Sequence, residues 1–363
     1  MAVVGGGIAG LTAAAALTRS GVECAVFEQA SLVGDGAGIQ LAPNATRLLH
    51  RLGVRLSDVA VRPEAVELRR WDSGELIART ELGAVCEARY GAPYYTLHRA
   101  DLHRALAALV DTVSLGRRCV AVTEHADRVA LDFTGGAVDA DMVVGADGIH
   151  SVVRATLDSS TAQPAGLAVH RGLFDADRLP WLRDRPAVRI WLGPGRHVVC
   201  YPVAGGARVS VTAVARSGAL TGYSGWHDNV REVLAVAAPM RTWTLDDRPP
   251  LSRWHTRRVA VIGDAAHPMP PLGAQGANQA IEDAVVLAGC LRGGPDLAAA
   301  LRRFERLRKP RVARVVAWVR GNVRDHHVAD GAAQRRRDAA APRQRDLDRQ
   351  EWLYGYDAER EVA

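Results

Sequence analysis

The chain has 363 residues, of which 48% are hydrophobic and 24% are charged. This composition is typical of a soluble globular enzyme and excludes a largely disordered protein. The net charge of +6 lies in the segment 301–363, which holds 16 basic and 10 acidic residues, so the preceding chain is neutral. Because those basic residues are interleaved with acidic ones and have no aromatic platform, they favour a solvated helical face over a nucleic-acid site.

The five cysteines are scattered without a Cys-x-x-Cys pair: Cys24, Cys86, Cys119, Cys200 and Cys290. Neither a disulfide framework nor a zinc site is indicated, so we expect no metal and a reducing, cytoplasmic location. The apolar stretch 1–17 lacks a basic leader and contains four glycines, which weaken a signal-peptide helix. No other stretch is long enough to span a bilayer, and we expect no membrane association.

The N-terminus is predicted to form a strand at 2–4, a glycine-rich turn, a helix, and a second strand that ends at Glu28. The turn has the spacing Gly-x-Gly-x-x-Gly, formed by Gly5, Gly7 and Gly10. These glycines suit a tight turn, a close approach of backbone to a pyrophosphate, and packing of helix on strand. The carboxylate of Glu28 suits ribose hydroxyls. The unit therefore predicts a Rossmann-type site for an unphosphorylated adenine dinucleotide.

Two later segments also place glycine directly after an apolar strand. The strand 142–144 runs into a Gly-Ala-Asp-Gly motif that contains Asp147 and Gly148, and the strand 258–262 runs into Gly-Asp at Asp264. Because the carboxyl ends of parallel strands meet at the same edge of a sheet, we expect all three turns to lie at one edge.

The segment after Asp264 leads into a long helix through a second glycine-rich stretch. After a proline-rich loop come Gly273, Gly276 and Ala277, and the helix is predicted over about 277–291. The carboxylate suits the ribityl hydroxyls of a flavin, and the helix N-terminus suits the anionic N1–C2=O edge of a reduced flavin. The first fingerprint does not separate NAD from FAD, whereas this segment favours FAD. The alternative is an ordinary helix with glycine capping.

The remaining segments are rich in strand-forming residues and turns. Residues 66–97 and 165–254 predict a mostly antiparallel substrate domain inserted into the nucleotide-binding domain. The segment 301–363 is expected to form an amphipathic helix over 302–323 and a weakly ordered basic tail. The predicted fold class is α/β, in which a Rossmann-like FAD-binding domain with a parallel sheet is discontinuous and spans 1–65, 98–164 and 255–300.

The three glycine motifs, in this order, resemble the group A flavoprotein monooxygenases, the p-hydroxybenzoate and salicylate hydroxylase family. The resemblance implies that Glu28 holds the adenosine ribose and that Arg99 contacts the linker region of FAD. It also implies that Asp264 binds the ribityl and phosphate side. Asp147 and Gly148 lie in the motif that this family associates with both FAD and NAD(P)H.

A closer resemblance connects the chain to the 6-hydroxynicotinate 3-monooxygenase branch of that family. The shared features include His197 and, four residues later, Tyr201. The resemblance implies that these side chains contact or deprotonate the hydroxylated ring, although a buried structural histidine and a packed tyrosine fit the sequence equally well. Gln40 stands where that branch has a histidine. We assign Gln40 to the substrate pocket, and the difference leaves the substrate open.

The resemblance implies a single-component FAD enzyme that hydroxylates a small aromatic or N-heteroaromatic substrate with NADH or NADPH and O₂, through a flavin C4a-hydroperoxide. His197 is the expected base because an unperturbed imidazole pKa of about 6.5 lies near working pH, and Tyr201 is expected to orient the substrate hydroxyl. Two other classes remain open: an FAD-dependent dehydrogenase or reductase of this fold, and a non-catalytic flavin-binding protein. The sequence does not specify the oligomeric state.

Overall fold

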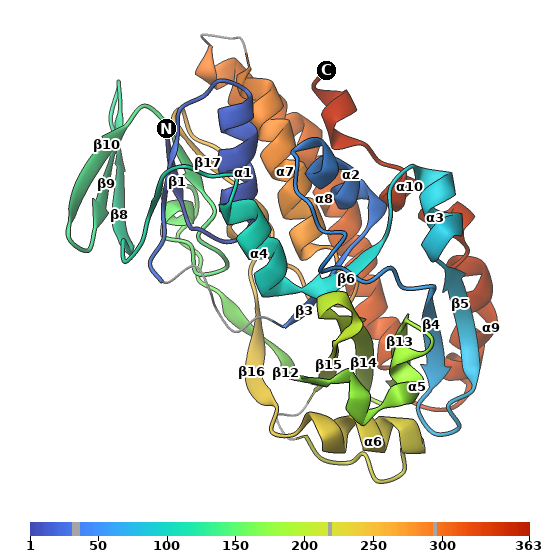
Figure 1. Ribbon diagram of the computed structural model, residues 1–363. Coiled ribbons are helices and arrows are strands. Elements are labelled where there is room, and N and C mark those ends of the chain that lie inside the picture. Colours follow the sequence, from blue (N-terminus) through green and yellow to red (C-terminus); the bar gives the residue numbers. More distant parts are fainter. Residues whose placement is uncertain (31–36, 217–219, 293–295) are drawn as a thin grey trace.

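The computed structural model describes residues 1–30, 37–216, 220–292 and 296–363 (Figure 1). A five-stranded parallel sheet forms one layer, in the order β17 (Val259–Val261), β11 (Val143–Gly145), β1 (Ala2–Val4), β2 (Ala25–Phe27) and β7 (Val113–Ser114). Since β1 pairs with β11 and β11 pairs with β17, all in parallel, the three glycine turns leave the same edge of the sheet. This part of the predicted fold is confirmed.

Helices cover the parallel sheet. α1 (Ile8–Arg19) packs against α7 (Gly276–Leu291), and α7 packs in turn against α8 (Leu297–His326). The long helices predicted after Asp264 and in the C-terminal segment are confirmed. Nearly every residue of α7 is buried, including Glu282 and Asp283, as expected of a helix that lies between two others. The smaller helices on this side are α2 (Pro43–Arg51) and α4 (Arg99–Ala107).

A seven-stranded sheet forms the other large layer, and only its β13–β4 pair is parallel. The mostly antiparallel sheet predicted from the strand pattern is therefore confirmed. Its order is β16 (Arg241–Asp247), β12 (Gln163–Asp175), β15 (Arg208–Ala215), β14 (Arg196–Val203), β13 (Ala187–Gly193), β4 (Ala65–Arg70) and β5 (Leu76–Glu81).

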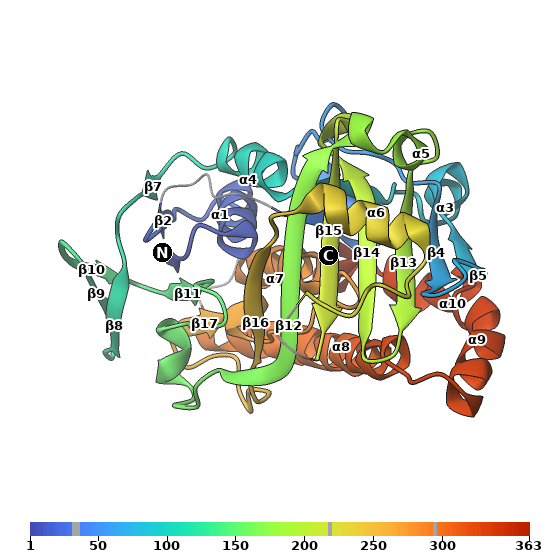
Figure 2. The ribbon, with the colours of Figure 1, turned by 90° about the horizontal axis from the view of Figure 1, so that it is seen from below.

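The two faces of this seven-stranded sheet have different covers. α6 (Asp228–Ala237) lies across one face, and α8 runs along the other (Figure 2). Val198 and Cys200 of β14 point into the apolar cluster under α6, whereas Val199 and Tyr201 belong to the cluster that includes residues of α8. This alternation follows from the two-residue period of a strand. We call the face covered by α8 the inner face.

Short elements join the two large sheets. β3 (Gly38–Leu41) pairs with β6 (Tyr95–His98), and both strands contact the seven-stranded sheet. A separate three-stranded sheet, which the sequence did not predict, projects from the parallel sheet and consists of β8 (Cys119–Glu124), β9 (Val129–Phe133) and β10 (Gly136–Ala140). The remaining helices before the C-terminal segment are α3 (Gly83–Tyr90) and α5 (Pro180–Arg183).

The C-terminal segment is helical, which corrects the expectation of a weakly ordered tail. After α8 come α9 (Ala332–Gln344) and α10 (Leu347–Tyr354). α9 packs on β5, and its Ala341 is buried with Leu68. Burial against the sheet therefore orders a helix whose own sequence is strongly polar. Within the described ranges, no helix is both long and apolar enough to cross a membrane.

Candidate active site

The first glycine turn leads from β1 into α1. Gly5 has a φ of +106°, and a Cβ there would overlap the backbone of Ala146 in the neighbouring turn. A Cβ at Gly10 would overlap the carbonyl oxygen of Gly5. At Gly7, the N-cap residue of α1, no atom lies within 4 Å of the Cβ position, and no side chain caps the helix. The turn is thus tightly packed behind and open in front of the helix N-terminus, where an anion binds favourably.

The carboxylate of Glu28 is held beside this turn. Its Oε2 accepts a hydrogen bond from the backbone N of Gly6 at 2.6 Å, and its Oε1 accepts one from the backbone N of Ala30 at 2.8 Å. These bonds orient the carboxylate at the carboxyl end of β2. Each oxygen keeps a further lone pair, so the group fits the ribose hydroxyls of a dinucleotide.

Asp147 organises the second glycine turn. Its Oδ1 accepts a hydrogen bond from Ser151 Oγ at 2.5 Å, and its Oδ2 accepts one from the backbone N of Val152 at 2.7 Å. Burial raises the pKa of Asp147, and these hydrogen bonds partly offset that rise. Gly148 has a φ of +79° and open space at its Cβ position. The geometry shows Asp147 holding the turn that leads into the 3₁₀ helix η1 (Val153–Thr156).

Arg154 ties the second turn to the third. Its side chain is fully buried, and its Nη2 donates to the carbonyl oxygen of Pro249 at 2.6 Å. Its Nη1 donates to the carbonyl oxygen of Ala265 at 3.3 Å, directly after Asp264. Breaking these bonds would separate two turns that must face the same nucleotide.

The third turn presents a carboxylate that the protein itself does not bind. Gly263 has a φ of +58°, and Asp264 follows it with no hydrogen-bond partner among the described residues. Burial raises the pKa of Asp264, and the charges of His267 and Arg99 offset part of that rise. A Cβ at Gly276, the first residue of α7, would lie 3.8 Å from Asp264 Oδ1. An unpaired carboxylate beside a helix start fits a polyhydroxylated, anionic ligand.

The glycine-rich segment before α7 has a packed part at Gly273 and an open part at the start of the helix. Gly273 lies directly against Trp318 of α8, where a Cβ would collide with the indole. Gly276 and Ala277 begin α7, and no side chain caps this helix start. The first backbone N–H groups of α7 therefore have no side-chain cap, and this helix start lies beside Asp264.

Two guanidinium groups have no acidic partner among the described residues: Arg99, which is near Asp264, and Arg171, which is near Arg99. Arg99 begins α4 and is exposed. Arg171 lies on the inner face of β12, and its Nε is buried without a hydrogen bond. Burial lowers the pKa of Arg171, the nearby Arg99 lowers it further, and Tyr201 opposes that shift. These cations supply a positive edge suited to a phosphate-bearing cofactor.

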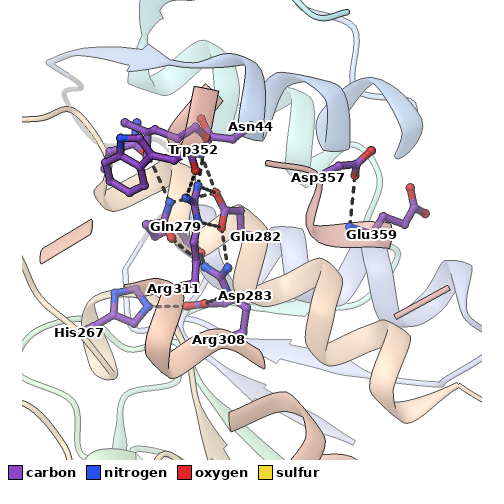
Figure 3. Close-up of polar contacts among 12 residues, drawn as sticks. Asn44, His267, Gln279, Glu282, Asp283, Arg308, Arg311, Trp352, Asp357 and Glu359 are labelled. Atoms are coloured by element: carbon purple, nitrogen blue, oxygen red, sulfur yellow. Dashed lines mark hydrogen bonds and ion pairs between the residues drawn. The ribbon is translucent and has the colours of Figure 1, made fainter. Parts of the chain in front are cut away.

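A buried ion network lies behind the third turn (Figure 3). Asp283 Oδ2 accepts hydrogen bonds from the backbone N of Gly263 at 3.0 Å and from His267 Nε2 at 2.5 Å. Its Oδ1 pairs with Arg308 Nε at 2.8 Å. Burial alone would raise the pKa of Asp283, but His267 and Arg308 hold it below its usual range. The pairing therefore fixes the Gly-Asp turn to α7 and α8.

Glu282 extends this network toward α2. It pairs with Arg308 Nη1 at 2.6 Å and with Arg311 Nη2 at 3.0 Å, and it accepts a hydrogen bond from Asn44 Nδ2 at 2.6 Å. The side chains of Glu282 and Arg308 are fully buried. Because a buried charge is costly unless paired, these groups hold α2, α7 and α8 in one arrangement.

Tyr201 and Gln40 meet at the junction of the two large sheets. Gln40 Oε1 accepts a hydrogen bond from Tyr94 Oη at 2.7 Å. Burial raises the pKa of Tyr201. The charge of Arg171 opposes this rise, and side-chain hydrogen bonds to Ser210 and Gln40 oppose it to a smaller extent. The inner face of β14 therefore places a phenol beside β3, next to the positive edge described above.

His197 lies four residues before Tyr201 on the same face of β14 but contacts a different group. Its Nδ1 is 2.8 Å from His327 Nε2, and its ring centroid is 5.2 Å from that of His326. Burial, and then the charge of His327, lower the pKa of His197 well below its usual range. His197 is therefore neutral at pH 7, and its proton affinity is lower than the unperturbed value on which the sequence expectation rested.

The sequence resemblance included Tyr94 and Tyr354 without giving them a role, and sequence reasoning missed the other members of this region: Arg171, Ser210, His326, His327 and Arg345. A paired His-His at the end of a predicted helix was a visible signal, but nothing nearby in the chain indicated its partner. Among the described residues no group of three or more His, Cys, Asp or Glu side chains could hold a metal ion.

Comparison with known proteins places this geometry in a family. A model of the FAD binding domain matches residues 1–319. The chain is 48% identical to 3-amino-4-hydroxybenzoate 2-monooxygenase from Streptomyces cremeus, over 98% of this chain and 94% of that protein. It is 33% identical to 6-hydroxynicotinate 3-monooxygenase from Bordetella bronchiseptica, over 89% of this chain and 92% of the relative.

A solved structure of similar fold contains the cofactor. HpxO of Klebsiella pneumoniae, in complex with FAD and uric acid, matches with a TM-score of 0.84 and 29% identity, over 99% of this chain and 94% of that one. The open glycine turn, the carboxylate of Glu28 beside it and the unpaired Asp264 fit such a dinucleotide. The expected family and cofactor are confirmed, and the chain belongs to the FAD-binding-domain family of FAD-dependent aromatic monooxygenases.

Proposed function

We propose that the protein is a single-component hydroxylase that uses NADH or NADPH and O₂ to hydroxylate an aminohydroxybenzoate, with 3-amino-4-hydroxybenzoate as the first substrate to test. The observation that carries the proposal is that the start of α7 lies beside both the unpaired carboxylate of Asp264 and the strand of Gln40, where Asn278 Nδ2 donates to the carbonyl oxygen of Gln40 at 3.1 Å. Identity of 48% to an enzyme named for that substrate supports the choice. When bound, reduced FAD supplies activated oxygen for transfer to an electron-rich ring.

The residues at the edge of the parallel sheet bind the cofactor in this proposal. Gly5, Gly7 and Gly10 leave room for the pyrophosphate at the start of α1. Glu28 accepts the ribose hydroxyls, and Arg99 neutralises charge in the linker region.

The remaining cofactor roles lie at the third turn. Asp264 binds the ribityl side, while Gly273, Gly276 and Ala277 bring the start of α7 to the flavin. Asp147 and Gly148 shape the turn past which the nicotinamide approaches.

The substrate roles belong to the inner face of β14. Tyr201 and Gln40 orient the ring hydroxyl. His197 accepts the phenolic proton at Nε2 in the tautomer that donates from Nδ1 to His327. Removing that proton makes the ring a better nucleophile. Burial of His197 keeps it neutral, as a base must be before reaction.

The test uses purified FAD-loaded protein and a panel of hydroxylated benzoates and N-heteroaromatics. For each compound, NAD(P)H oxidation, oxygen uptake, peroxide and product mass are measured together. We expect one substrate to stimulate NAD(P)H oxidation and to gain 16 mass units, about the mass of one oxygen atom. Stimulated oxidation that yields only peroxide with every compound would exclude the hydroxylase, and release of FMN on heating would exclude the cofactor.

A further inference from the structure

A guanidinium without an acidic partner lines a cavity next to the candidate active site. Arg345 lies between α9 and α10 and borders a cavity of about 980 Å³. Residues of α8, α9 and α10 line this open cavity, among them Asp325 and Glu351, together with Leu68 and Leu192 on the inner face of the seven-stranded sheet. Arg345 belongs to the C-terminal segment that the sequence predicted to be weakly ordered.

The partners of Arg345 are weak. Its Nη2 lies 3.4 Å from Asn322 Oδ1 and 3.4 Å from His326 Nε2. Within the described part of the chain, no carboxylate lies within ion-pair distance of this guanidinium. Burial lowers the pKa of Arg345, and the more distant Tyr354, Asp325 and Tyr94 do not offset that effect. A desolvated guanidinium without a counter-ion is energetically costly. The surroundings of Arg345 therefore suit a bound anion that would supply the missing negative charge.

Arg345 also borders the residues assigned to substrate. Tyr94, whose hydroxyl is bonded to Gln40, is near enough to Arg345 to be among the groups that affect its pKa. On the other side, the His326 ring meets the His197 ring edge to face, with a centroid distance of 5.2 Å and an interplanar angle of 72°. The guanidinium therefore stands between the tyrosine side and the histidine side of the site.

We infer that Arg345 binds the carboxylate of an aromatic acid substrate and so selects acids over neutral phenols. The inference rests on the proposed function and deepens it. A planar guanidinium matches a carboxylate with two parallel hydrogen bonds, and the pairing would neutralise the crowded cation.

A second unpartnered guanidinium, Arg171, fits this role less well. It lies close to Arg99, which we assign to the phosphate-bearing linker of FAD. Arg345 has no such cofactor group beside it. The two cations therefore serve different anions.

The experiment compares an acid with its neutral amide. Dissociation constants and kcat/KM for 3-amino-4-hydroxybenzoate and 3-amino-4-hydroxybenzamide are measured with FAD-loaded wild type, Arg345→Gln, Arg345→Lys and Arg343→Gln. Arg343 is the matched control because it lines the same cavity but is exposed. Flavin content and thermal unfolding establish that each variant is folded.

We expect wild type and Arg343→Gln to bind the acid on the order of 10- to 100-fold more tightly than the amide. Arg345→Gln should lose that preference by weakening the acid alone, and Arg345→Lys should keep part of it. If Arg345→Gln weakens acid and amide equally, or keeps the preference, Arg345 is not the carboxylate site, while the proposed function stands. If wild type shows no preference for the acid, the aminohydroxybenzoate substrate and the Arg345 site both fail.

Discussion

His197 Nδ1 lies 2.8 Å from His327 Nε2, so the candidate base on β14 is held by the residue that ends α8. The two rings are tilted by 34°, and neither has an acidic partner among the described residues. The pair therefore differs from a His–Asp couple, in which a carboxylate stabilises the charged imidazole. A neutral partner leaves the proton affinity of His197 low and dependent on burial.

His197→Ala should slow hydroxylation by on the order of 10²- to 10⁴-fold without loss of FAD, because general-base assistance is removed. The defect should shrink at higher pH, where the phenol ionises unaided. Stopped-flow hydroxylation across pH measures this. His170→Ala is the control, since His170 is a buried histidine of the same sheet that bonds Thr242 instead. Wild-type coupling and rate in His197→Ala would remove His197 from the mechanism.

Acid should destabilise the protein through its buried histidines. Burial lowers the pKa of His327 from 6.5 to about 4. The unfolded chain therefore binds more protons between these values, and the stability contributed by neutral His327 is present above pH 6.5 and lost as pH falls toward 4. The loss is about 3 kcal/mol at most.

Urea unfolding at pH 7 and at pH 4.5 measures this dependence in wild type and in His327→Gln. The variant should lose less unfolding free energy on acidification than wild type does, and the comparison cancels groups that titrate alike in both proteins. Equal losses in the two proteins would show that His327 is protonated in the folded state near its ordinary pKa.

Asp264→Ala should weaken FAD binding more than Asp147→Ala does. Asp264 has no hydrogen-bond partner within the described ranges, so its removal should lower FAD affinity without lowering the free energy of unfolding. Asp147 accepts three hydrogen bonds inside its own turn, so its loss should also lower the unfolding free energy of the flavin-free protein, by about 1–3 kcal/mol. Flavin titration and urea unfolding of both variants test this, and equal flavin affinities would contradict the assigned roles.

Arg308→Met should be strongly destabilising, by about 3–5 kcal/mol, because it leaves the buried carboxylates of Glu282 and Asp283 without their shared cation. Urea unfolding measures the loss. Arg306→Met on the same helix is the control, since Arg306 is exposed and should change stability by less than about 0.5 kcal/mol. Similar stabilities for the two variants would mean that the network contributes little.

Tyr201→Phe should raise the KM for the aromatic substrate by roughly 3- to 10-fold, the effect of one neutral hydrogen bond, with a smaller change in kcat. Tyr223→Phe provides the control because the Tyr223 hydroxyl is buried without a hydrogen bond on the α6 side of the sheet. Steady-state kinetics of both variants decide the matter. A fall in kcat with unchanged KM would assign Tyr201 to the chemical step instead of substrate positioning.

The nucleotide edge could be predicted because its signals are local. Gly5, Gly7 and Gly10 and the strand that ends at Glu28 lie within one strand–helix–strand unit, where backbone conformation and side-chain alternation follow directly from neighbouring residues. The same holds for Asp264 and the start of α7. By contrast, the polar sequence of α9 gave no signal for its helix, because that helix is stabilised by packing on β5.

The sequence by itself determined the flavin-type edge and the alternation that puts His197 and Tyr201 on one face of a strand. Tertiary structure alone decided which groups those side chains meet. Asn44 binds Glu282 from 238 residues away, and His197 meets His327 across 130 residues. Such pairs leave no periodic trace in the chain, because a side chain's distant partner depends on how whole elements pack. For the same reason the unpaired charge of Arg345 became visible only once the helices around it were in place.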